Sequence, residues 1–535
     1  MYSGISGGEH RIGKDKDMKA GVVWCKKILG YALAVICTIM AFFLTYYSTC
    51  YSMRQITVPD GVAMLETRDS LALHFLTAAV FLIVILAARR RKREICRERG
   101  CRLALGAVML CATLCSFIWV ASGNFYAMDD SRQVLDCMEH MRNGDYSDLR
   151  PNGYLGIYQQ HFGLITLFRI IFFLAGTTDD MAVRFFNCLC IPVIIYAGFQ
   201  VLKELNASRT SLIGYLLLAV FCFPLLFYTP YVYGEIISAT AGMLFIWAAL
   251  CYLKRGNIST WPAMAASAVI GNMARGNFPV LLIAFGMVAF LYSVRRKKPK
   301  FLLCAVSLFL AVVLAGKVNV AYYEKISGIA LDQGLPPEAT IAMGMDEYGE
   351  LGYGTYNGFE VQLLAGCGYD KEATRLQAGQ FIRDRVKMFV TGAGMSARDF
   401  YKGKLLVQWN DPTLNCFMEN RNFILPPQHP VRDIVSEEGK YAALARELMN
   451  QYQFLLYTGF LLYCLSLLGR GNVSFCQYLP LIIIFGGFLF TLLWEAMSRY
   501  VFPYIIYMIP LAATGWDLAG QRIGNIRDVF RGKGK

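Results

Sequence analysis

The chain alternates between long apolar runs and shorter polar stretches. Most apolar runs are roughly 17 to 22 residues long, and about 20 residues let a helix cross the hydrocarbon core of a bilayer. We therefore predict an all-α polytopic membrane protein with about twelve transmembrane helices. The predicted spans are 27–48, 71–88, 103–121, 181–202, 211–229, 236–253, 258–273, 278–294, 301–317, 453–469, 476–494 and 500–517.

The distribution of charge gives these spans an orientation. The formal net charge is +14, which in a soluble protein would suggest a nucleic-acid partner. Here the basic residues gather in loops that all fall on the side of the N-terminal tail, such as RRRKREICRERGCR and RRKKPK. Because basic loops remain in the cytoplasm, we predict a multi-pass protein of the cell membrane with both termini cytoplasmic. The lipid bilayer, and no nucleic acid, is the expected partner.

Two segments are too polar to span and fall on the outer side. The second one contains Gly/Pro-rich turns and a predicted helix from Lys371 to about Val390, which indicates an external, mainly helical mixed domain. The predicted division is a tail with two extra spans (1–102), a transmembrane core (103–317) with its first external loop (122–180), an external domain (318–452), and C-terminal spans with a basic tail (453–535).

One apolar run in the first external loop does not fit the spanning pattern. Residues 163–176, GLITLFRIIFFLAG, form a run of 14 residues that contains Arg169. If this run crossed the membrane, every later basic loop would change sides. We therefore predict an interfacial helix that lies on the outer face.

Charged residues collect at the external ends of the predicted spans. They are Asp129, Asp130, Glu235, Arg275, Glu495 and Arg499. Desolvating charge beside lipid is costly and has to be offset by pairing, a metal or a ligand, so their convergence favours a site. A carboxylate can take a proton from an attacking hydroxyl or amine, and arginines can hold a phosphate. The pattern is typical of group transfer from a lipid-linked donor.

Familiar catalytic motifs are missing from the sequence. It has no GxxxxGK[ST] loop and no GxGxxG at a strand-to-helix turn, so nothing marks a nucleotide site. HExxH and GxSxG are also missing, which removes the commonest metalloprotease and serine-hydrolase signals. A nucleotide sugar is therefore not the expected donor.

The order of these features resembles the GT-C superfamily of integral-membrane glycosyltransferases, of the protein O-mannosyltransferase and aminoarabinose transferase type. Asp129 in YAMDDSRQ resembles the Asp that opens the first external loop in this superfamily, and Asp130 takes the second acidic place. Glu235 in YVYGE and Arg275 resemble an acid and a basic residue at later external turns. The segment WEAMSRYVFP, with Glu495, Arg499 and Tyr500, resembles a late acid, Arg-Tyr and Pro pattern.

This resemblance implies transfer of a sugar from a polyprenyl-phosphate donor to a glycan, lipid or protein acceptor on the extracytoplasmic face. It implies that Asp129 is the base, and that Asp130 and Glu235 support it or, with Asp129, bind a divalent cation such as Mg²⁺ or Mn²⁺. Arg275 and Arg499 would hold the donor phosphate. The remaining residues that it places in the substrate cavity are Tyr158, Gln159 and His161 of YLGIYQQHFG, with Glu495 and Tyr500.

Two other classes of function remain open. One is a transporter or flippase of lipid-linked or small polar substrates, but such proteins place ionisable residues near mid-membrane, and here only Arg184 lies clearly within a predicted span. The other is a non-catalytic scaffold for envelope assembly. Among individual residues, a lone His beside aromatic rings is more often packed than ligating, and Lys404, Trp409 and Asp411 suit a structural turn better than an acceptor contact.

Overall fold

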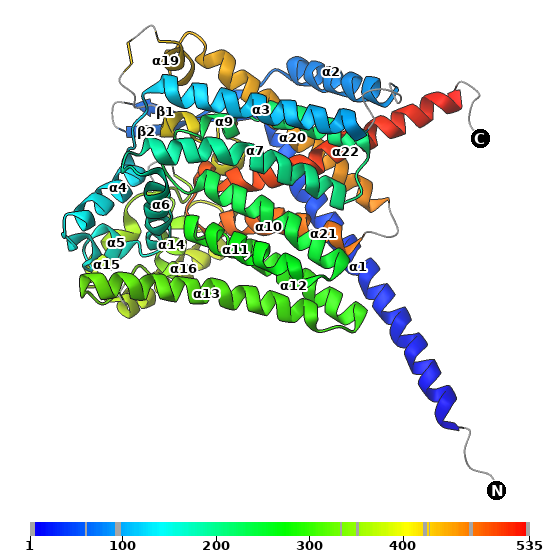
Figure 1. The fold of residues 1–535 in the computed structure, drawn as a ribbon, viewed down its shortest axis with the longest axis horizontal. Helices are drawn as coiled ribbons and strands as arrows, with labels where there is room; N and C mark the ends of the chain where they lie inside the picture. Colours follow the sequence, from blue (N-terminus) through cyan, green and yellow to red (C-terminus); the bar gives the residue numbers. More distant parts are fainter. Residues whose placement is uncertain are drawn as a thin grey trace.

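Long helices lying side by side make up most of the molecule (Figure 1). The computed structural model describes residues 6–58, 61–90, 98–331, 334–348, 352–420, 425–426, 429–469 and 474–530. Within them, ten helices are long and apolar enough to cross a membrane. These are α1 (Ser6–Cys50), α2 (Leu71–Arg90), α3 (Glu98–Gly123), α7 (Met181–Glu204), α10 (Glu235–Arg255), α12 (Pro279–Arg296), α13 (Lys300–Ser327), α20 (Ala442–Leu468), α21 (Phe475–Leu493) and α22 (Phe502–Phe530).

The helical, multi-pass class is confirmed, but the count of twelve spans is not. The predicted span 211–229 is divided between α8 (Arg209–Val220) and α9 (Phe223–Phe227), because Pro224 has no N–H to donate to the carbonyl of Val220 and its ring would clash with that carbonyl. The predicted span 258–273 becomes a 3₁₀ turn, η2 (Ile258–Thr260), and α11 (Trp261–Ala274). With 14 residues, α11 is about 21 Å long, shorter than the hydrocarbon core of about 30 Å.

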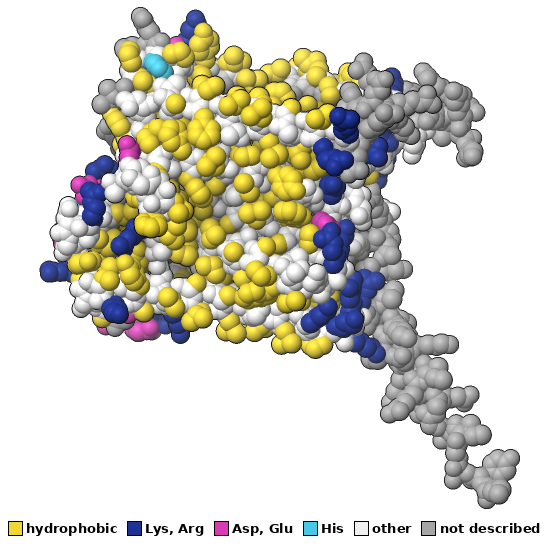
Figure 2. All heavy atoms as spheres, viewed as in Figure 1, with side chains coloured by type: hydrophobic (Ala, Val, Ile, Leu, Met, Phe, Trp, Pro, Cys, Tyr) yellow, Lys and Arg dark blue, Asp and Glu magenta, His cyan; other side chains and the backbone are white. Residues whose placement is uncertain are grey.

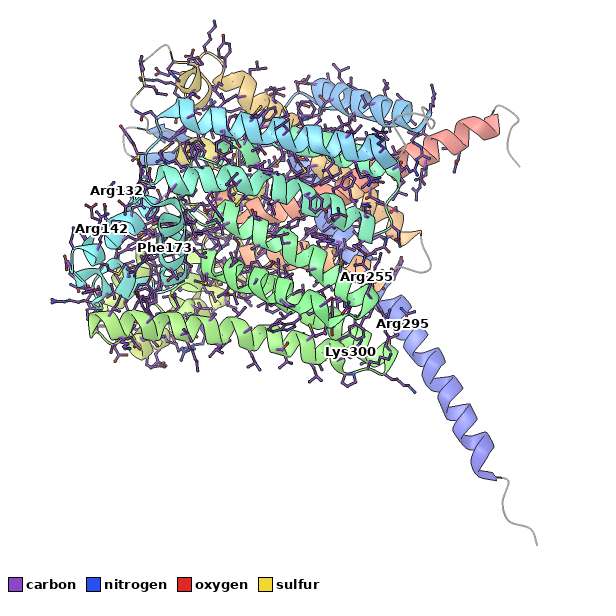
Figure 3. The ribbon with its side chains drawn as sticks, in the orientation of Figure 1. Arg132, Arg142, Phe173, Arg255, Arg295 and Lys300 are labelled. Atoms are coloured by element: carbon purple, nitrogen blue, oxygen red, sulfur yellow. The ribbon has the colours of Figure 1, made fainter. Side chains whose placement is uncertain are left out.

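Basic side chains gather at one end of the long helices (Figure 2). Arg255 ends α10, Arg295 lies in the last turn of α12 and Lys300 begins α13, and Figure 3 labels all three at this end. Apolar side chains cover the helices between this end and the other (Figure 2). We call the end with Arg255, Arg295 and Lys300 the basic end. Its cytoplasmic location is the expectation from charge.

The first external loop folds into helices at the opposite end. They are α4 (Asp129–Arg142), η1 (Ser147–Leu149), α5 (Tyr154–Ile157) and α6 (His161–Ala175). The segment 147–157 meets α6 at a bend of 113°, and Figure 1 shows α6 lying across the direction of α7 and α10. Phe168 of α6 is buried whereas Phe173 is 85% exposed. The apolar run around Arg169 is thus a helix that packs against the bundle on one side only.

The second polar segment also consists of helices packed on this opposite end. Their bounds are α14 (Pro337–Gly344), α15 (Phe359–Gly366), α16 (Lys371–Thr391), α17 (Ala397–Trp409), α18 (Cys416–Glu419) and α19 (Pro430–Val435). The helix predicted from Lys371 is confirmed as α16. The predicted limits of the segment differ from the observed ones, since α13 continues to Ser327 and α20 already begins at Ala442.

A β-hairpin that the hydropathy pattern did not predict joins α1 to α2. Its strands, β1 (Tyr51–Val58) and β2 (Gly61–Arg68), pair antiparallel with Val58 opposite Gly61. The backbone N–H of Met53 donates to Asn410 O at 2.9 Å, and Asn410 Nδ2 donates to Tyr51 O at 2.8 Å. The hairpin therefore ties the first two spans to the end of α17.

Small residues let α20 and α22 approach closely. A methyl group built on Gly515 of α22 would lie 1.8 Å from Gly459 O of α20. Beside it, Trp516 Nε1 donates to Leu455 O at 2.9 Å. Close contact between helix backbones at small residues is a common basis of helix association in membranes.

Replacing Gly515 with Val should therefore destabilise the fold by roughly 1–3 kcal/mol, the usual cost of overpacking. Thermal unfolding in detergent, followed by circular dichroism, measures the change. Gly524→Val, in the same helix, is the matched control. A side chain at this position would meet no described atom of the surrounding structure within 4 Å. Equal loss of stability in both variants would contradict the close contact.

Orientation can be tested with Arg142→Cys and Lys298→Cys. Arg142 lies in α4 at the opposite end from Lys298, which lies beside the basic end. In intact cells, a membrane-impermeant maleimide should label position 142 and leave position 298 unlabelled. Labelling of the wild-type protein, which has cysteines of its own, gives the background to subtract. Labelling of position 298 alone would reverse the predicted orientation.

Candidate functional site

Arg499 joins segments that are far apart in the chain. It lies in η3 (Ser498–Val501), between α21 and α22. Its Nη2 contacts Asp130 Oδ2 at 2.9 Å, and its Nη1 donates to Glu419 Oε1 and Tyr231 OH, both at 3.0 Å. Arg499 and Glu419 are buried, so their charges are neutralised by protein partners instead of water.

A second arginine lies beside the first. Arg275, in the turn after α11, contacts Glu235 Oε1 through Nη1 at 3.2 Å. Its guanidinium carbon lies 5.2 Å from the Tyr233 ring centroid and 5.1 Å from that of Tyr500, and the Arg499 guanidinium carbon lies 5.8 Å and 5.5 Å from the same two rings. Two cations therefore share one pair of aromatic faces, which are attractive sites for positive charge.

We call these side chains the arginine cluster. Its members are Asp130, Tyr231, Tyr233, Glu235, Arg275, Glu419, Arg499 and Tyr500. Glu235 begins α10, and Arg255 at the basic end terminates the same helix, so the cluster lies at the opposite end of the bundle. Four of the charged residues that the sequence placed on one face, Asp130, Glu235, Arg275 and Arg499, thus meet in one place, and Glu495 lies beside them, bonded to Tyr500.

The backbone decides which acid of the Asp129–Asp130 pair enters the cluster. Asp129 has a φ of +48°, in the left-handed region that Asp tolerates better than most residues, and its side chain is exposed. Ser131 Oγ accepts a hydrogen bond from Met128 N–H at 3.0 Å and fixes the start of α4. The left-handed turn precedes Asp130, and it is the carboxylate of Asp130 that contacts Arg499. Asp129, predicted to lie at the centre of the site, instead has an exposed side chain at the start of α4.

Aromatic side chains from α5 and α6 form a wall beside Asp130. Tyr154 OH lies 3.4 Å from Asp130 Oδ1 and donates to it. The His161 ring stacks against Tyr154 at 5.4 Å, and His161 Nε2 lies 2.8 Å from Tyr233 OH. His161, which the sequence alone favoured as a packed residue, is therefore packed and also hydrogen-bonded to the cluster.

The acids at this end differ in ionisation. Burial raises the pKa of Asp130, but Arg499, His161 and Arg275 together outweigh that effect and the net pKa is lowered. Burial raises the pKa of Glu419 and of Glu495, and Arg499 only partly opposes the shift. Glu495 also accepts a hydrogen bond from Tyr500 OH at 2.8 Å. Asp130 is therefore the acid of this group most firmly held as a carboxylate.

Glu360 is a further buried acid, which the sequence did not single out. It lies in the first turn of α15 and is only 3% exposed. Tyr158 OH donates to Glu360 Oε1 at 3.2 Å, and this hydrogen bond joins the loop that carries Tyr158 to α15. Burial raises the pKa of Glu360 to about 7, and Glu495 and Asp130 add to the shift, whereas Thr340 and Tyr158 oppose it. The Tyr356 side chain also faces this carboxyl group.

Gln159 points elsewhere. A methyl group built on Gly334 would lie 2.6 Å from Gln159 Cδ, so the Gln159 side chain packs against that glycine. Its predicted place in a substrate cavity is not supported by a contact to the arginine cluster among the described residues. Glycine at 334 leaves the space that this side chain occupies.

Of the three residues predicted to lie in a structural turn, only Asp411 does so, whereas Lys404 and Trp409 lie in α17. Asp411 Oδ2 accepts a hydrogen bond from Ser498 Oγ at 2.7 Å, and Trp409 Nε1 donates to Thr491 Oγ1 at 3.0 Å. Lys404 is buried and donates to Gly344 O, and burial lowers its pKa to about 7, opposed by Glu495. Asp411 therefore fixes η3, the element that carries Arg499.

The predicted metal ligands are not arranged as a metal site. Asp130 is paired with Arg499, Glu235 is paired with Arg275, and Asp129 is exposed. Across the described part of the chain, no three His, Cys, Asp or Glu side chains come together in a way that could hold a metal ion. The three carboxylates do not fit a shared Mg²⁺ or Mn²⁺ site, because guanidinium groups occupy two of them.

The sequence pattern did not single out several residues at this end of the bundle. Tyr231 and Tyr233 could have been found, because they alternate with Glu235 in YTPYVYGE. Glu419 and Glu360 stand alone in the external segment, and their partners lie 80 and 202 residues away along the chain. Only the fold brings them to the site.

Glu360→Gln should reduce the dependence of stability on pH. A carboxyl group whose pKa is raised in the folded state stabilises the protein at low pH, and this contribution is lost as pH rises from about 4.5 to about 7. Thermal unfolding at pH 5 to 8 should therefore show wild-type stability falling with pH by up to about 3 kcal/mol more than that of the variant.

Glu372→Gln is the matched control for this measurement. Its side chain is exposed on α16 and pairs with Arg375 at the surface. The stability of Glu372→Gln should change with pH as that of the wild type does. An identical pH profile in Glu360→Gln and wild type would show that Glu360 does not titrate as a buried acid.

Comparison with known proteins supplies no relative from which a function could be transferred. Neither the models of protein families nor the curated proteins include a match to this chain. The function has to be inferred from the residues of the arginine cluster themselves.

Proposed function

We propose that the protein is an integral-membrane glycosyltransferase of the GT-C type. It would transfer a sugar from a polyprenyl-phosphate donor to a glycan, lipid or protein acceptor on the extracytoplasmic face. The observation that carries the proposal is the arginine cluster, in which two arginines and an accessible carboxylate meet where the long helices end. A phosphate on a lipid carrier lies at that depth in a membrane.

Asp130 replaces Asp129 as the proposed base. Its side chain is 38% exposed, whereas those of Glu235 and Glu419 are 2% and 8% exposed. An acceptor can therefore reach Asp130 more readily than the other acids of the cluster. The lowered pKa of Asp130 also keeps it unprotonated at neutral pH, which a base requires.

In the proposed reaction, an acceptor hydroxyl attacks the anomeric carbon of the donor sugar while Asp130 takes the hydroxyl proton. The new glycosidic C–O bond forms as the C–O bond to phosphate breaks. The polyprenyl phosphate leaves with the electron pair, and attack from the opposite side inverts the anomeric carbon. No oxidation or reduction occurs, so the step needs no further reactant.

Arg275 and Arg499 would stabilise the leaving phosphate. Arginine binds phosphate through paired hydrogen bonds, and fixed cations act most strongly on charge that develops during the reaction. The Arg275 side chain is 15% exposed and Arg499 is more deeply buried, at 9%. Arg275 is therefore the more accessible contact, with Arg499 behind it holding Asp130.

The decisive comparison is between Asp130→Asn and Asp129→Asn. Both substitutions remove one carboxylate, and Asn tolerates the left-handed backbone at 129 as Asp does. With labelled polyprenyl-phosphate sugars and candidate acceptors, Asp130→Asn should lose transfer by about 10²- to 10⁴-fold, the usual value of general-base catalysis. Asp129→Asn should retain most of it.

Other outcomes separate the alternatives. A loss confined to Asp129→Asn would return the base to the first acid of the pair. Movement of the labelled lipid across the bilayer without transfer, in wild type, would favour a flippase. Neither transfer nor movement across a panel of donors and acceptors would favour an assembly scaffold.

A further inference from the structure

A cavity opens at the basic end, far from the arginine cluster. Its volume is about 660 Å³, and it lies between the turn that joins α10 to α11 and the first turns of α13. The residues that line it and bear on its chemistry are Tyr252, Asn257, Trp261, Lys300, Leu303 and Ser307. None of these residues takes part in the proposed transfer reaction.

The mouth of the cavity is positively charged. Lys300 Nζ donates to Gly256 O at 2.7 Å, and because this acceptor is neutral the ammonium charge remains available to an anion. The Arg296 guanidinium carbon and Lys300 Nζ lie 5.6 Å and 5.5 Å from the same ring, that of Phe301. Nearby, Glu204 is already engaged by two cations of α10.

The cavity also has an apolar wall that continues onto the lipid-facing surface. Leu303 and Ile258 are exposed, at 63% and 66%, beside the Trp261 ring. Trp261 Nε1 donates to Ser307 Oγ at 2.9 Å, which holds the indole against α13. Trp and Tyr favour the level of the lipid headgroups, where one side of the ring is apolar and the other is wet. Tyr252, whose OH donates to Lys300 O at 2.9 Å, completes this arrangement.

We propose that this cavity binds one anionic glycerophospholipid, with its phosphate at Lys300 and an acyl chain along Trp261 and Leu303. A basic pocket between helices at the headgroup level is suited to such a lipid. Charge selects an anionic headgroup over a zwitterionic one, and the apolar wall selects a lipid over free phosphate. The proposal is independent of the transfer reaction, so it stands or falls separately from it.

Native mass spectrometry of the full-length protein in detergent tests the proposal. Phosphatidylglycerol and phosphatidylcholine with identical acyl chains are titrated separately, and the affinity of the first lipid bound is compared. We expect tighter binding of phosphatidylglycerol, and about fivefold weaker binding of it to Lys300→Gln. Lys300→Arg should restore binding, because the positive charge is kept.

Lys317→Gln is the matched control. Lys317 is an exposed lysine of the same helix, about 26 Å further along α13 at 1.5 Å per residue. The Lys317→Gln variant should bind phosphatidylglycerol as tightly as the wild type does. Equal affinity for both lipids, or an equal loss in Lys317→Gln and Lys300→Gln, would overturn the proposal. Displacement of the lipid by millimolar inorganic phosphate would reduce the cavity to an anion site and would also overturn it.

Discussion

The buried guanidinium of Arg499 is the interaction on which the opposite end of the bundle depends. Its charge is met by Asp130 from α4 and Glu419 from α18, with Tyr231 completing the contacts. Removing one partner of a buried ion pair typically costs about 3–5 kcal/mol, because the other charge is left uncompensated. The same contacts therefore hold three segments together and set the electrostatics of the proposed reaction.

Arg499 is itself held by a scaffold outside the cluster. Asp411 fixes Ser498 next to it, and Asn410, one residue before Asp411, binds the hairpin between α1 and α2. The helices α1 and α2 are thus connected to the site through hydrogen bonds. Their contribution is positional, since neither supplies a side chain to the arginine cluster among the described residues.

The sequence predicted that charged residues gather at one end of the helices better than it predicted which of them make contact. Apolar run lengths and basic loops give the helical membrane class, and the external turns give Asp130, Glu235, Arg275 and Arg499 as a group. The choice between Asp129 and Asp130 depends on one left-handed φ, which no pattern of residue types reveals. The predicted count of twelve spans is not confirmed, in part because hydropathy does not register the helix break before Pro224. The β-hairpin had a turn signal, Pro59-Asp60-Gly61, that hydropathy also ignores.

The long separation between paired charges has a consequence for biosynthesis. Glu235 and Arg275 are close in the chain, so their pair can form as soon as α10 and α11 are inserted. Asp130 and Arg499 are 369 residues apart, so their pair can form only after the segment that carries Arg499 has been synthesised. During that interval Tyr154, which is 24 residues from Asp130 in the chain, is the partner that can already be present. The segment that contains Arg499 then completes the arginine cluster, so Asp130 gains its charged partner long after α4 has been made.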